Sequence, residues 1–348
     1  MPESLLSIRD LTVDFTTPEG VVHAVDHVSY DVFPDEVVGV VGESGCGKTV
    51  TALSLLGLVP DPPGRVVEGQ VLFENRDLLG LSPKELRRIR GNEISMIFQD
   101  PQSSLNPVFS IGRQVAGVLR AHDRRLSGKA ARGRVVELLD KVGVTDARSR
   151  ADDYPHQWSG GMCQRAMIAM AIANQPKLLI ADEPTTALDV TIQTQVLDVL
   201  RVAQDETGAA TMLITHDLGV VAEMAARVVV MYAGRVVEAG PVDSIFHAPR
   251  HPYTLGLMAS LPRLDGAVRR LDPIPGQPPS LVSVPPGCPF HPRCRLRRGR
   301  DVCARETPAL ASVGSGEHEA ACHFSDEMPD EISEVSAAIG VDLRAGQR

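Results

Sequence analysis

The chain lacks a positive charge excess, a long apolar run and a secretory leader, and each absence excludes a class of protein. Its formal net charge is -9, so no overall positive field is available to hold a nucleic-acid backbone. A membrane-spanning helix needs roughly 18 or more apolar residues in a row, and no such run occurs. The first residues lack the basic stretch followed by an apolar one that marks a signal peptide. We therefore expect no nucleic-acid partner and a protein that stays in the cytosol.

Composition and length indicate a globular protein. Hydrophobic residues make up 43% of the 348 residues and charged residues 23%, which leaves enough apolar material for a core. Wholesale disorder, collagen-like repeats and a small disulfide scaffold are therefore excluded. At roughly 150 residues per domain, the length predicts two domains, one large and one small.

Hydrophobic periodicity predicts an α/β fold with a β-rich beginning. The first forty residues alternate as strands do, and residues 37–41 are apolar throughout, as in a strand covered on both faces of a parallel sheet. Helical patterns at 111–121 and 129–142 predict a helical insert over about 101–158. Strands are expected again at 177–181, 210–215 and 227–232, with a helix over 190–207.

The chain changes character after residue 261. A proline-rich stretch over 272–279 is followed by four of the six cysteines and by an acidic tail from Ser325. We place the domain boundary near Pro262. The predicted parts are a large domain over 1–262, a small Cys-rich module over 263–324 and a tail over 325–348, which we expect to be disordered.

A phosphate-binding motif lies between the predicted strand at 37–41 and a predicted helix. The pattern G-x-x-x-x-G-K-[ST] is matched by Gly42, Glu43, Ser44, Gly45, Cys46, Gly47, Lys48 and Thr49. Backbone N–H groups of such a loop point at phosphate oxygens, Lys48 reaches the β and γ phosphates, and the Thr49 hydroxyl ligates Mg²⁺. Cys46 is expected to contribute mainly its backbone, with a reactive thiol as the alternative. A glycine-rich turn that matches by chance is the other interpretation of the motif.

Two adjacent carboxylates end a second apolar strand. Asp182 and Glu183 follow the apolar residues 178–181, and strand alternation sends their side chains in different directions. Asp182 can bind the magnesium shell, while Glu183 can polarise a water for in-line attack on the γ-phosphate. An apolar strand followed by Asp-Glu is common, so the pair alone is weak evidence for a catalytic site. It becomes evidence for ATP hydrolysis because the same chain contains the phosphate loop with Lys48.

A second anion site is predicted where Trp158-Ser159-Gly160-Gly161-Met162 precedes a helix over 163–174. Free N–H groups and the Ser159 hydroxyl at a helix N-terminus suit a phosphate group. One nucleotide does not need both this site and the phosphate loop. An ordinary helix capped by Ser159 is the alternative interpretation.

Together these motifs resemble the ATP-binding subunit of an ABC transporter. Six blocks occur in the family's order over residues 1 to about 255: the phosphate loop, Gln99, Ser159-Gly160-Gly161, Asp182-Glu183, Thr186-Ala187-Leu188-Asp189 and His216. The resemblance implies a P-loop NTPase fold, namely an ABC nucleotide-binding domain with an antiparallel β subdomain and a helical insert. It also implies that two such subunits pack head to tail, with each ATP between the phosphate loop of one subunit and Ser159, Gly160 and Gly161 of the other.

The same resemblance assigns roles to four further residues. Gln99 would sense the magnesium ion and the attacking water and couple them to the membrane partner through the helical insert. His216 would contact the γ-phosphate, and Asp189 would bridge the dimer beside the water. Phe15 is the candidate for stacking on adenine.

Three residues depart from the family's usual signature. Trp158 and Met162 stand where leucine and glutamine are usual, and Cys163 stands where a basic residue is more frequent in this subgroup. Because the small Ser-Gly-Gly segment is the part that would bind phosphate, we expect catalysis to be retained despite these three differences.

Residues 98–107, 251–254 and 274–279 narrow the resemblance to the oligopeptide and dipeptide importers, which include nickel and glutathione importers. The likeness extends to His323. It implies an ATP hydrolase at the cytoplasmic face of the membrane that energises peptide import. The implied partners are two integral-membrane permeases, a second, related ATPase subunit and an external substrate-binding protein. An ATPase for nickel or glutathione import is an alternative, and a soluble non-transport ABC ATPase or an exporter ATPase would belong to another class.

Four cysteines lie close to the end of the chain, at Cys288, Cys294, Cys303 and Cys322. In a reducing compartment such a group predicts a metal or cluster site before it predicts disulfides. The spacing is wider than that of zinc knuckles, yet four thiolates suit either Zn²⁺ or an iron–sulfur cluster. Resemblance to peptide importers with similar cysteines favours a [4Fe-4S] cluster over Zn²⁺ or free thiols. Neighbouring histidines that could replace one thiolate are His291, His318 and His323.

The cluster is expected to be structural, because proline-rich chain over 273–289 cannot build a core alone. The neighbouring arginines are Arg293, Arg295, Arg297, Arg298 and Arg300. Their positive charge would offset an anionic cluster, and a solvated basic loop is the alternative.

Overall fold

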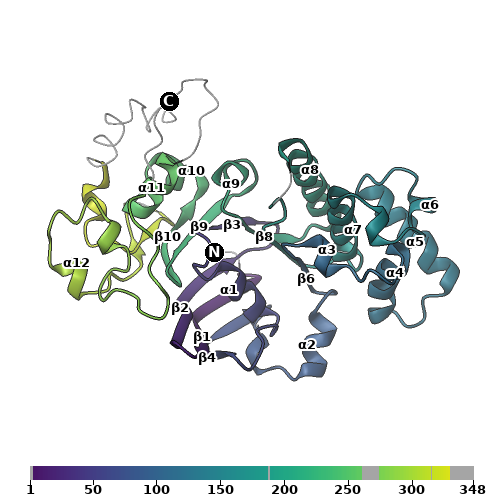
Figure 1. The fold of residues 1–348 in the computed structure, drawn as a ribbon, viewed down its shortest axis with the longest axis horizontal. Helices are drawn as coiled ribbons and strands as arrows, with labels where there is room; N and C mark the ends of the chain where they lie inside the picture. Colours follow the sequence, from purple (N-terminus) through teal and green to yellow (C-terminus); the bar gives the residue numbers. More distant parts are fainter. Residues whose placement is uncertain (1–2, 187–188, 261–273, 315, 330–348) are drawn as a thin grey trace. The chain divides into compact units, whose positions relative to one another are not determined.

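The computed structural model describes residues 3–186, 189–260, 274–314 and 316–329 (Figure 1). The chain divides into two compact units. The first unit comprises Met1–Leu5, Val32–Glu36 and Phe73–Ile214. The second comprises Leu6–Asp31, Val37–Leu72 and Thr215–Arg348. The predicted domain boundary near Pro262 lies outside the described residues.

The first unit contains a parallel sheet of buried strands. Its strands are β6 (Ile94–Ile97), β7 (Leu178–Asp182) and β8 (Ala210–Ile214), in that order. Each of their residues is buried, as expected of strands covered on both faces. Because the strands are parallel, their carboxyl ends lie at one edge of this sheet, where Asp182 ends β7.

Helices make up most of the remaining first unit, and their ends follow local sequence signals. They are α2 (Pro83–Ile89), α3 (Pro101–Ser104), α4 (Ile111–His122), α5 (Gly128–Lys141), α6 (Ala147–Arg150), α7 (Gly160–Ile172) and α8 (Val190–Thr207). Shorter elements are β5 (Arg76–Asp77), η1 (Leu78–Gly80) and η2 (Pro155–Gln157). Ser82 and Glu85 form a capping box at α2, and Gly208 ends α8 with a φ of 62°. The helices predicted over 111–121, 129–142 and 190–207 are confirmed within one residue at each end.

Helices α4 and α5 of the predicted insert region pack together and against α7, which begins just after that region. Helix α4 contacts α5, both contact α7, and α7 contacts β6 (Figure 1). The side chains of Ile111, Val115 and Leu119 are buried at intervals of four residues along α4, which is the apolar stripe of an amphipathic helix. Helix α7 therefore connects α4 and α5 to strand β6 of the parallel sheet.

The second unit combines two groups of strands. One contains β1 (Leu6–Thr17), β2 (Gly20–Val32) and β4 (Gly64–Phe73), in the order β2-β1-β4. In the other, β3 (Val37–Val41) pairs in parallel with β9 (Arg227–Tyr232), which pairs antiparallel with β10 (Arg235–Pro241). Two short strands, β12 (Glu319–Ala320) and β11 (Ala311–Ser312), extend this group beyond β10. The helices are α1 (Lys48–Leu55), α9 (Leu218–Met224), α10 (Val242–His247), α11 (Pro252–Ala259) and α12 (Val302–Arg305), with η3 (His291–Arg293) and η4 (Ser325–Glu327).

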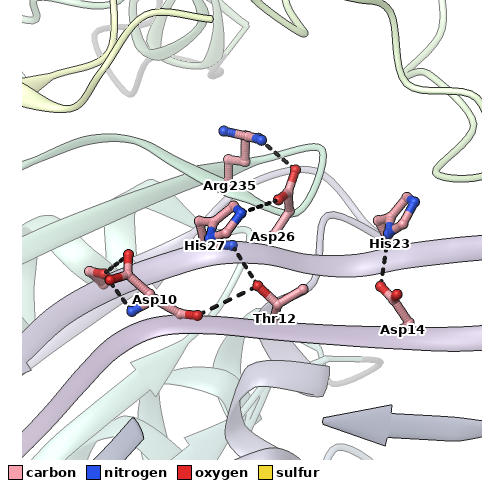
Figure 2. A network of polar contacts seen from close by, with 8 residues as sticks. Asp10, Thr12, Asp14, His23, Asp26, His27 and Arg235 are labelled. Atoms are coloured by element: carbon pink, nitrogen blue, oxygen red, sulfur yellow. Dashed lines mark hydrogen bonds and ion pairs between the residues drawn. The ribbon is translucent and has the colours of Figure 1, made fainter. Parts of the chain in front are cut away.

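Polar contacts hold the β1–β2 hairpin to the turn between β9 and β10. The Asp26 backbone N–H donates to the Gly234 carbonyl at 2.8 Å, and Arg235 Nε donates to the Asp26 carboxylate at 2.7 Å. Figure 2 shows Arg235 reaching Asp26 from β10, with the His23–Asp14 pair further along the hairpin at 2.8 Å. The hairpin is therefore fixed at the strand turn that follows β9.

Within the second unit, the Cys-rich module is held to β10 by a strand and by a buried side-chain contact. Strand β12 pairs with β10, and His318 Nε2 lies 2.8 Å from the Glu238 carboxylate, whose residue is fully buried. Met328 is also fully buried and packs with Leu255 and Leu296. The tail predicted from Ser325 therefore begins with packed residues, and its remainder over 330–348 lies outside the described residues.

Among the described residues, none of the helices combines the length and apolar character that crossing a bilayer requires.

Candidate active site

The predicted phosphate loop, residues 42–49, is a tight turn between buried strand β3 and helix α1. Gly42 and Gly47 have φ values of 153° and 104°. A Cβ at Gly42 would lie 2.2 Å from the Met231 carbonyl oxygen, and one at Gly47 would lie 2.3 Å from the Ala24 carbonyl oxygen. Only glycine fits these two positions, because both the backbone conformation and the neighbouring carbonyls exclude a side chain. The strand–loop–helix context that the motif requires is therefore present.

Lys48 is buried and folds back over the loop. Its Nζ donates to the carbonyl oxygens of Gly42 at 2.7 Å and Glu43 at 3.1 Å, and it lies 3.8 Å from Cys46 Sγ. Burial raises the pKa of the Cys46 thiol, although the Lys48 ammonium partly opposes this shift. A protonated, buried thiol favours the interpretation that Cys46 serves through its backbone, whose carbonyl accepts from Gly234 N–H at 3.1 Å.

Two residues from beyond the phosphate loop hold Glu43. The Tyr253 hydroxyl accepts the Glu43 backbone N–H at 2.8 Å, and Arg293 donates to both carboxylate oxygens. The sequence marked Tyr253 only as part of a family segment and Arg293 only as part of a basic stretch. No local signal links either residue to Glu43, since the contacts join positions more than 200 residues apart.

In the first unit, Gln99 and Glu183 lie together at the end of the sheet. Gln99 Nε2 and Thr186 Oγ1 both donate to Glu183 Oε2 at 2.8 Å. Glu183 has a φ of 45°, in the left-handed region that non-glycine residues rarely adopt. This turn directly after β7 separates the half-buried Glu183 carboxylate from Asp182, which is 2% exposed. The two carboxylates therefore have different surroundings, as strand alternation predicted.

The predicted second anion site lies at the start of α7. Ser159 Oγ accepts the Met162 N–H at 3.4 Å, which confirms Ser159 as the N-cap. A Cβ at Gly161 would lie 2.8 Å from Ile192 Cγ2 in α8. Asp189 caps α8, and its Oδ1 accepts the Ile192 N–H at 3.0 Å. The structure therefore brings Ser159, Gly161 and Asp189 to neighbouring helix starts within the first unit, while Ala187 and Leu188 lie outside the described residues.

Two of the three unusual residues of this segment, Trp158 and Cys163, are buried. Trp158 is 6% exposed, and its Nε1 donates to Asp153 Oδ2 at 3.3 Å. Cys163 is 1% exposed, its Sγ lies 3.7 Å from the Pro155 carbonyl oxygen, and burial raises the pKa of its thiol. Trp158 and Cys163 therefore serve packing, whereas Ser159 remains exposed.

Phe15 and His216 belong to the second unit, as does the phosphate loop. His216 is exposed and directly follows Thr215, whose N–H donates to the Val40 carbonyl of β3 at 3.2 Å. The half-buried Phe15 ring lies against Gly64, where a Cβ would come within 2.7 Å of it. The stacking role of Phe15 and the γ-phosphate contact of His216 stay predictions.

The four C-terminal cysteines lie in one neighbourhood. The Cys288 N–H donates to the Cys303 carbonyl at 2.9 Å, while Cys294 and Cys322 pack against the same buried cluster of Leu255, Leu296 and Met328. Burial raises the pKa values of Cys294 and Cys322 to about 12. The other three cysteines contribute electrostatically to the raised pKa of Cys322.

The four cysteine sulfurs are suitable ligands for a thiophilic metal, but they are not arranged as a metal site. In the parts of the chain that are described, no group of three or more His, Cys, Asp or Glu side chains is placed to hold a metal ion. The three candidate histidines have other partners: His291 contacts the Cys288 carbonyl, His318 contacts Glu238 and His323 contacts the Glu306 carbonyl. The basic stretch is not a solvated loop throughout, because Arg293 is buried and Arg300 pairs with Glu327.

Two family models match the chain. The model for ABC transporters matches residues 25–186, and the model described as the oligopeptide/dipeptide transporter C-terminal region matches residues 237–303. The second match includes three of the four C-terminal cysteines and Arg293.

Curated relatives match most of the chain. It is 50% identical over 328 residues to the dipeptide transport ATP-binding protein DppD of Bacillus subtilis (strain 168), with 94% of this chain and 97% of that protein covered. It is 52% identical over 319 residues to the oligopeptide transport ATP-binding protein OppD of Mycobacterium tuberculosis (strain ATCC 25618 / H37Rv). That second match covers 91% of this chain and spans 51% of the relative.

Solved structures share the fold. A dimeric structure of a post-hydrolysis state of the ATP-binding cassette MJ0796 bound to ADP and Pi is 28% identical, with a TM-score of 0.61. The match covers 68% of this chain and 98% of that one. The fold is thus the α/β fold of a P-loop nucleotide-binding cassette.

Proposed function

We propose, from the premise that this chain belongs to the ATP-binding subunits of dipeptide and oligopeptide ABC transporters, that it hydrolyses ATP to energise peptide import through a membrane permease. The observation that carries the proposal is the phosphate loop, in which Gly42 and Gly47 are sterically required and Lys48 is held over the loop carbonyls. We infer that the transported solute is a peptide because the relatives are named for dipeptide and oligopeptide transport.

The phosphate loop would hold the triphosphate of ATP. Its backbone N–H groups and the start of α1 supply partial positive charge, and Lys48 supplies a full charge to the β and γ phosphates. The Thr49 hydroxyl and the Asp182 carboxylate would hold Mg²⁺, whose charge offsets that of the phosphates. Phe15 would stack on the adenine ring.

Glu183 would act as the general base. Its carboxylate accepts a proton from a water molecule, the water oxygen bonds to the γ-phosphorus, and the bond to the β–γ bridging oxygen breaks to give ADP and phosphate. Gln99 and Thr186 both donate to Oε2 of Glu183, which fixes the orientation of the carboxylate that would take the proton. His216 would stabilise the γ-phosphate on the same nucleotide.

A second, related ATPase subunit would complete each site. Ser159, Gly160 and Gly161 of one subunit would bind the γ-phosphate held by the phosphate loop of its partner, with Asp189 at the dimer contact. The dimeric solved structure supports this arrangement, since it belongs to a cassette of the same fold. The further partners would be two integral-membrane permeases and an external substrate-binding protein, which places the chain peripherally at the cytoplasmic face of the membrane.

Transport measurements on the assembled complex test this function. The complex of this chain with its permeases and second ATPase is to be reconstituted in liposomes with the binding protein, and ATP hydrolysis measured with and without candidate cargo. We expect dipeptides or oligopeptides to stimulate hydrolysis and to enter the liposomes. Stimulation by nickel or glutathione alone would reassign the cargo, and no stimulation by any solute would contradict a transport function.

We propose in addition that Cys288, Cys294, Cys303 and Cys322 bind a [4Fe-4S] cluster with a structural role. Four thiols, of which Cys294 and Cys322 pack on one buried cluster and Cys288 and Cys303 are joined by a backbone hydrogen bond, provide the right donors. Such a cluster would tie together a module whose own buried apolar cluster is small. Because the apo thiols are protonated, loading would release protons.

Metal analysis of the purified protein tests the cluster. We expect about four iron and four sulfide per chain with absorbance near 400 nm, and loss of both in Cys288→Ser. Cys163→Ser is the matched control, since this buried cysteine lies in the first unit and should leave the iron content unchanged. Colourless protein with one zinc per chain would assign Zn²⁺ instead, and protein free of both metals would contradict a metal site.

A further inference from the structure

Arg293 forms a buried, two-pronged ion pair with the phosphate loop. Its Nη1 donates to Glu43 Oε2 at 2.6 Å and its Nη2 donates to Glu43 Oε1 at 3.0 Å. The Arg293 side chain is 6% exposed and that of Glu43 is 25% exposed. Bidentate geometry with little solvent access distinguishes this pair from surface ion pairs, which contribute little.

The remaining donors of Arg293 are also occupied. Its Nε donates to the Pro275 carbonyl at 2.9 Å, and Nη1 lies 3.4 Å from the Tyr232 hydroxyl. The guanidinium carbon lies 5.8 Å from the centre of the Tyr232 ring and 6.0 Å from that of Phe290. The bonds to Glu43 are the main reason that the pKa of Arg293 is raised, so the guanidinium stays charged. The side chain is therefore fixed in one orientation that faces the loop.

Glu43 connects this arginine to Lys48. The Glu43 carboxylate binds Arg293, its backbone N–H donates to the Tyr253 hydroxyl at 2.8 Å, and its carbonyl accepts from Lys48 Nζ at 3.1 Å. The Cys46 N–H also donates to the same carbonyl at 3.3 Å. Every polar group of Glu43 is thus engaged, and two of its partners come from segments C-terminal to residue 250.

We propose that Arg293 and Tyr253 are positioning residues for ATP binding, which hold the phosphate loop in its binding conformation through Glu43. The proposal rests on the proposed ATPase function and adds a part of the site that lies far from the motif in sequence. A loop that is already ordered loses less conformational freedom when it binds a ligand. Arg293 also neutralises a carboxylate that would otherwise stand, uncompensated, in the loop that binds a triphosphate.

Substitution of Arg293 should therefore weaken ATP binding. We expect Arg293→Met to raise the dissociation constant for ATP by roughly 10- to 100-fold, because removal of one partner leaves the Glu43 charge unpaired. Tyr253→Phe removes only the hydroxyl that accepts the loop N–H, and we expect it to raise the constant by about 3- to 10-fold. Binding is to be measured by calorimetry on the full chain, with circular dichroism and iron content recorded for each variant.

Arg300→Met is the matched control. Arg300 forms a similar two-pronged pair with Glu327, at 2.9 and 2.8 Å, in the same C-terminal module. Its carboxylate partner lies outside the phosphate loop, so we expect ATP affinity within about twofold of wild type. Equal losses in Arg293→Met and Arg300→Met would mean that the module acts only through its overall stability, and would overturn the proposal.

A double-mutant cycle identifies the route through Glu43. We expect Glu43→Gln, which removes the unpaired charge, to restore most of the affinity lost in Arg293→Met, so that the two effects are far from additive. Additive effects, or wild-type affinity in Arg293→Met, would overturn the proposal. If Arg293→Met does not fold, wild-type affinity in Tyr253→Phe would overturn it. Failure of the wild-type chain to bind ATP would instead contradict the proposed function.

Discussion

Replacing Glu183 with glutamine is expected to lower ATP hydrolysis by about 10²- to 10⁴-fold, the usual contribution of a general base. Glutamine keeps the shape of the side chain, and its amide oxygen can still accept from Gln99 and Thr186, which both donate to Glu183 Oε2 at 2.8 Å. What the variant loses is the ability to take a proton from water. ATP affinity should therefore stay within about threefold of wild type.

The measurement is single-turnover phosphate release from the assembled complex, with nucleotide affinity determined in parallel. Glu206→Gln, at an exposed carboxylate of the same unit near the end of α8, is the control and should hydrolyse ATP at the wild-type rate. Unchanged hydrolysis in Glu183→Gln would reject Glu183 as the base. Loss of ATP affinity together with hydrolysis would mean that the residue serves binding.

The second large effect is expected from Gly160→Asp. In the described part of the chain, no heavy atom lies within 4 Å of the position that a Cβ on Gly160 would take. An aspartate in the first turn of α7 would stabilise the helix by about 0.5 kcal/mol through the helix dipole. Nothing within the described subunit therefore requires glycine at this position, and the fold should tolerate the change.

The same carboxylate should interfere with ATP bound to a partner subunit. If Gly160 faces the γ-phosphate of an ATP held by another subunit, the new carboxylate repels that phosphate and fills the space that it needs. We expect hydrolysis to fall by roughly 10²-fold, with no loss of thermal stability and with unchanged ATP binding to the chain's own phosphate loop.

Gly161→Ala provides the contrast, because its Cβ would lie 2.8 Å from Ile192 Cγ2 and should lower the melting temperature. Wild-type hydrolysis in Gly160→Asp would contradict the role of this helix start in a second subunit's site.

The parts of the fold that the sequence predicted are those determined by nearby residues. Strand β3 is buried at each of its five positions, and α8 begins at the Asp189 cap and ends at Gly208 as the local pattern indicates. The phosphate loop was predictable from its motif between a buried strand and a helix, although the carbonyls that exclude a side chain at Gly42 and Gly47 belong to Met231 and Ala24. Caps, turns and apolar periodicity need no knowledge of distant segments.

The parts that the sequence did not predict depend on contacts between distant segments. Arg293 was one of five arginines that a solvated loop could explain, and only the fold brings its guanidinium to Glu43. His318 was a candidate metal ligand, but β12 carries it to the buried Glu238. Glu183 likewise has a left-handed backbone, and its N–H donates to the Ile214 carbonyl of β8 at 2.8 Å. No local pattern encodes these pairings.

The central step of the proposed mechanism is that ATP joins two subunits, each of which supplies half of a site. Analytical ultracentrifugation tests this directly with the Glu183→Gln variant and its partner ATPase in Mg²⁺-ATP, where hydrolysis cannot reopen the complex. We predict that the pair sediments as a dimer with ATP and as monomers without nucleotide or when Gly160→Asp is present in both chains. The same sedimentation with and without ATP would contradict the account.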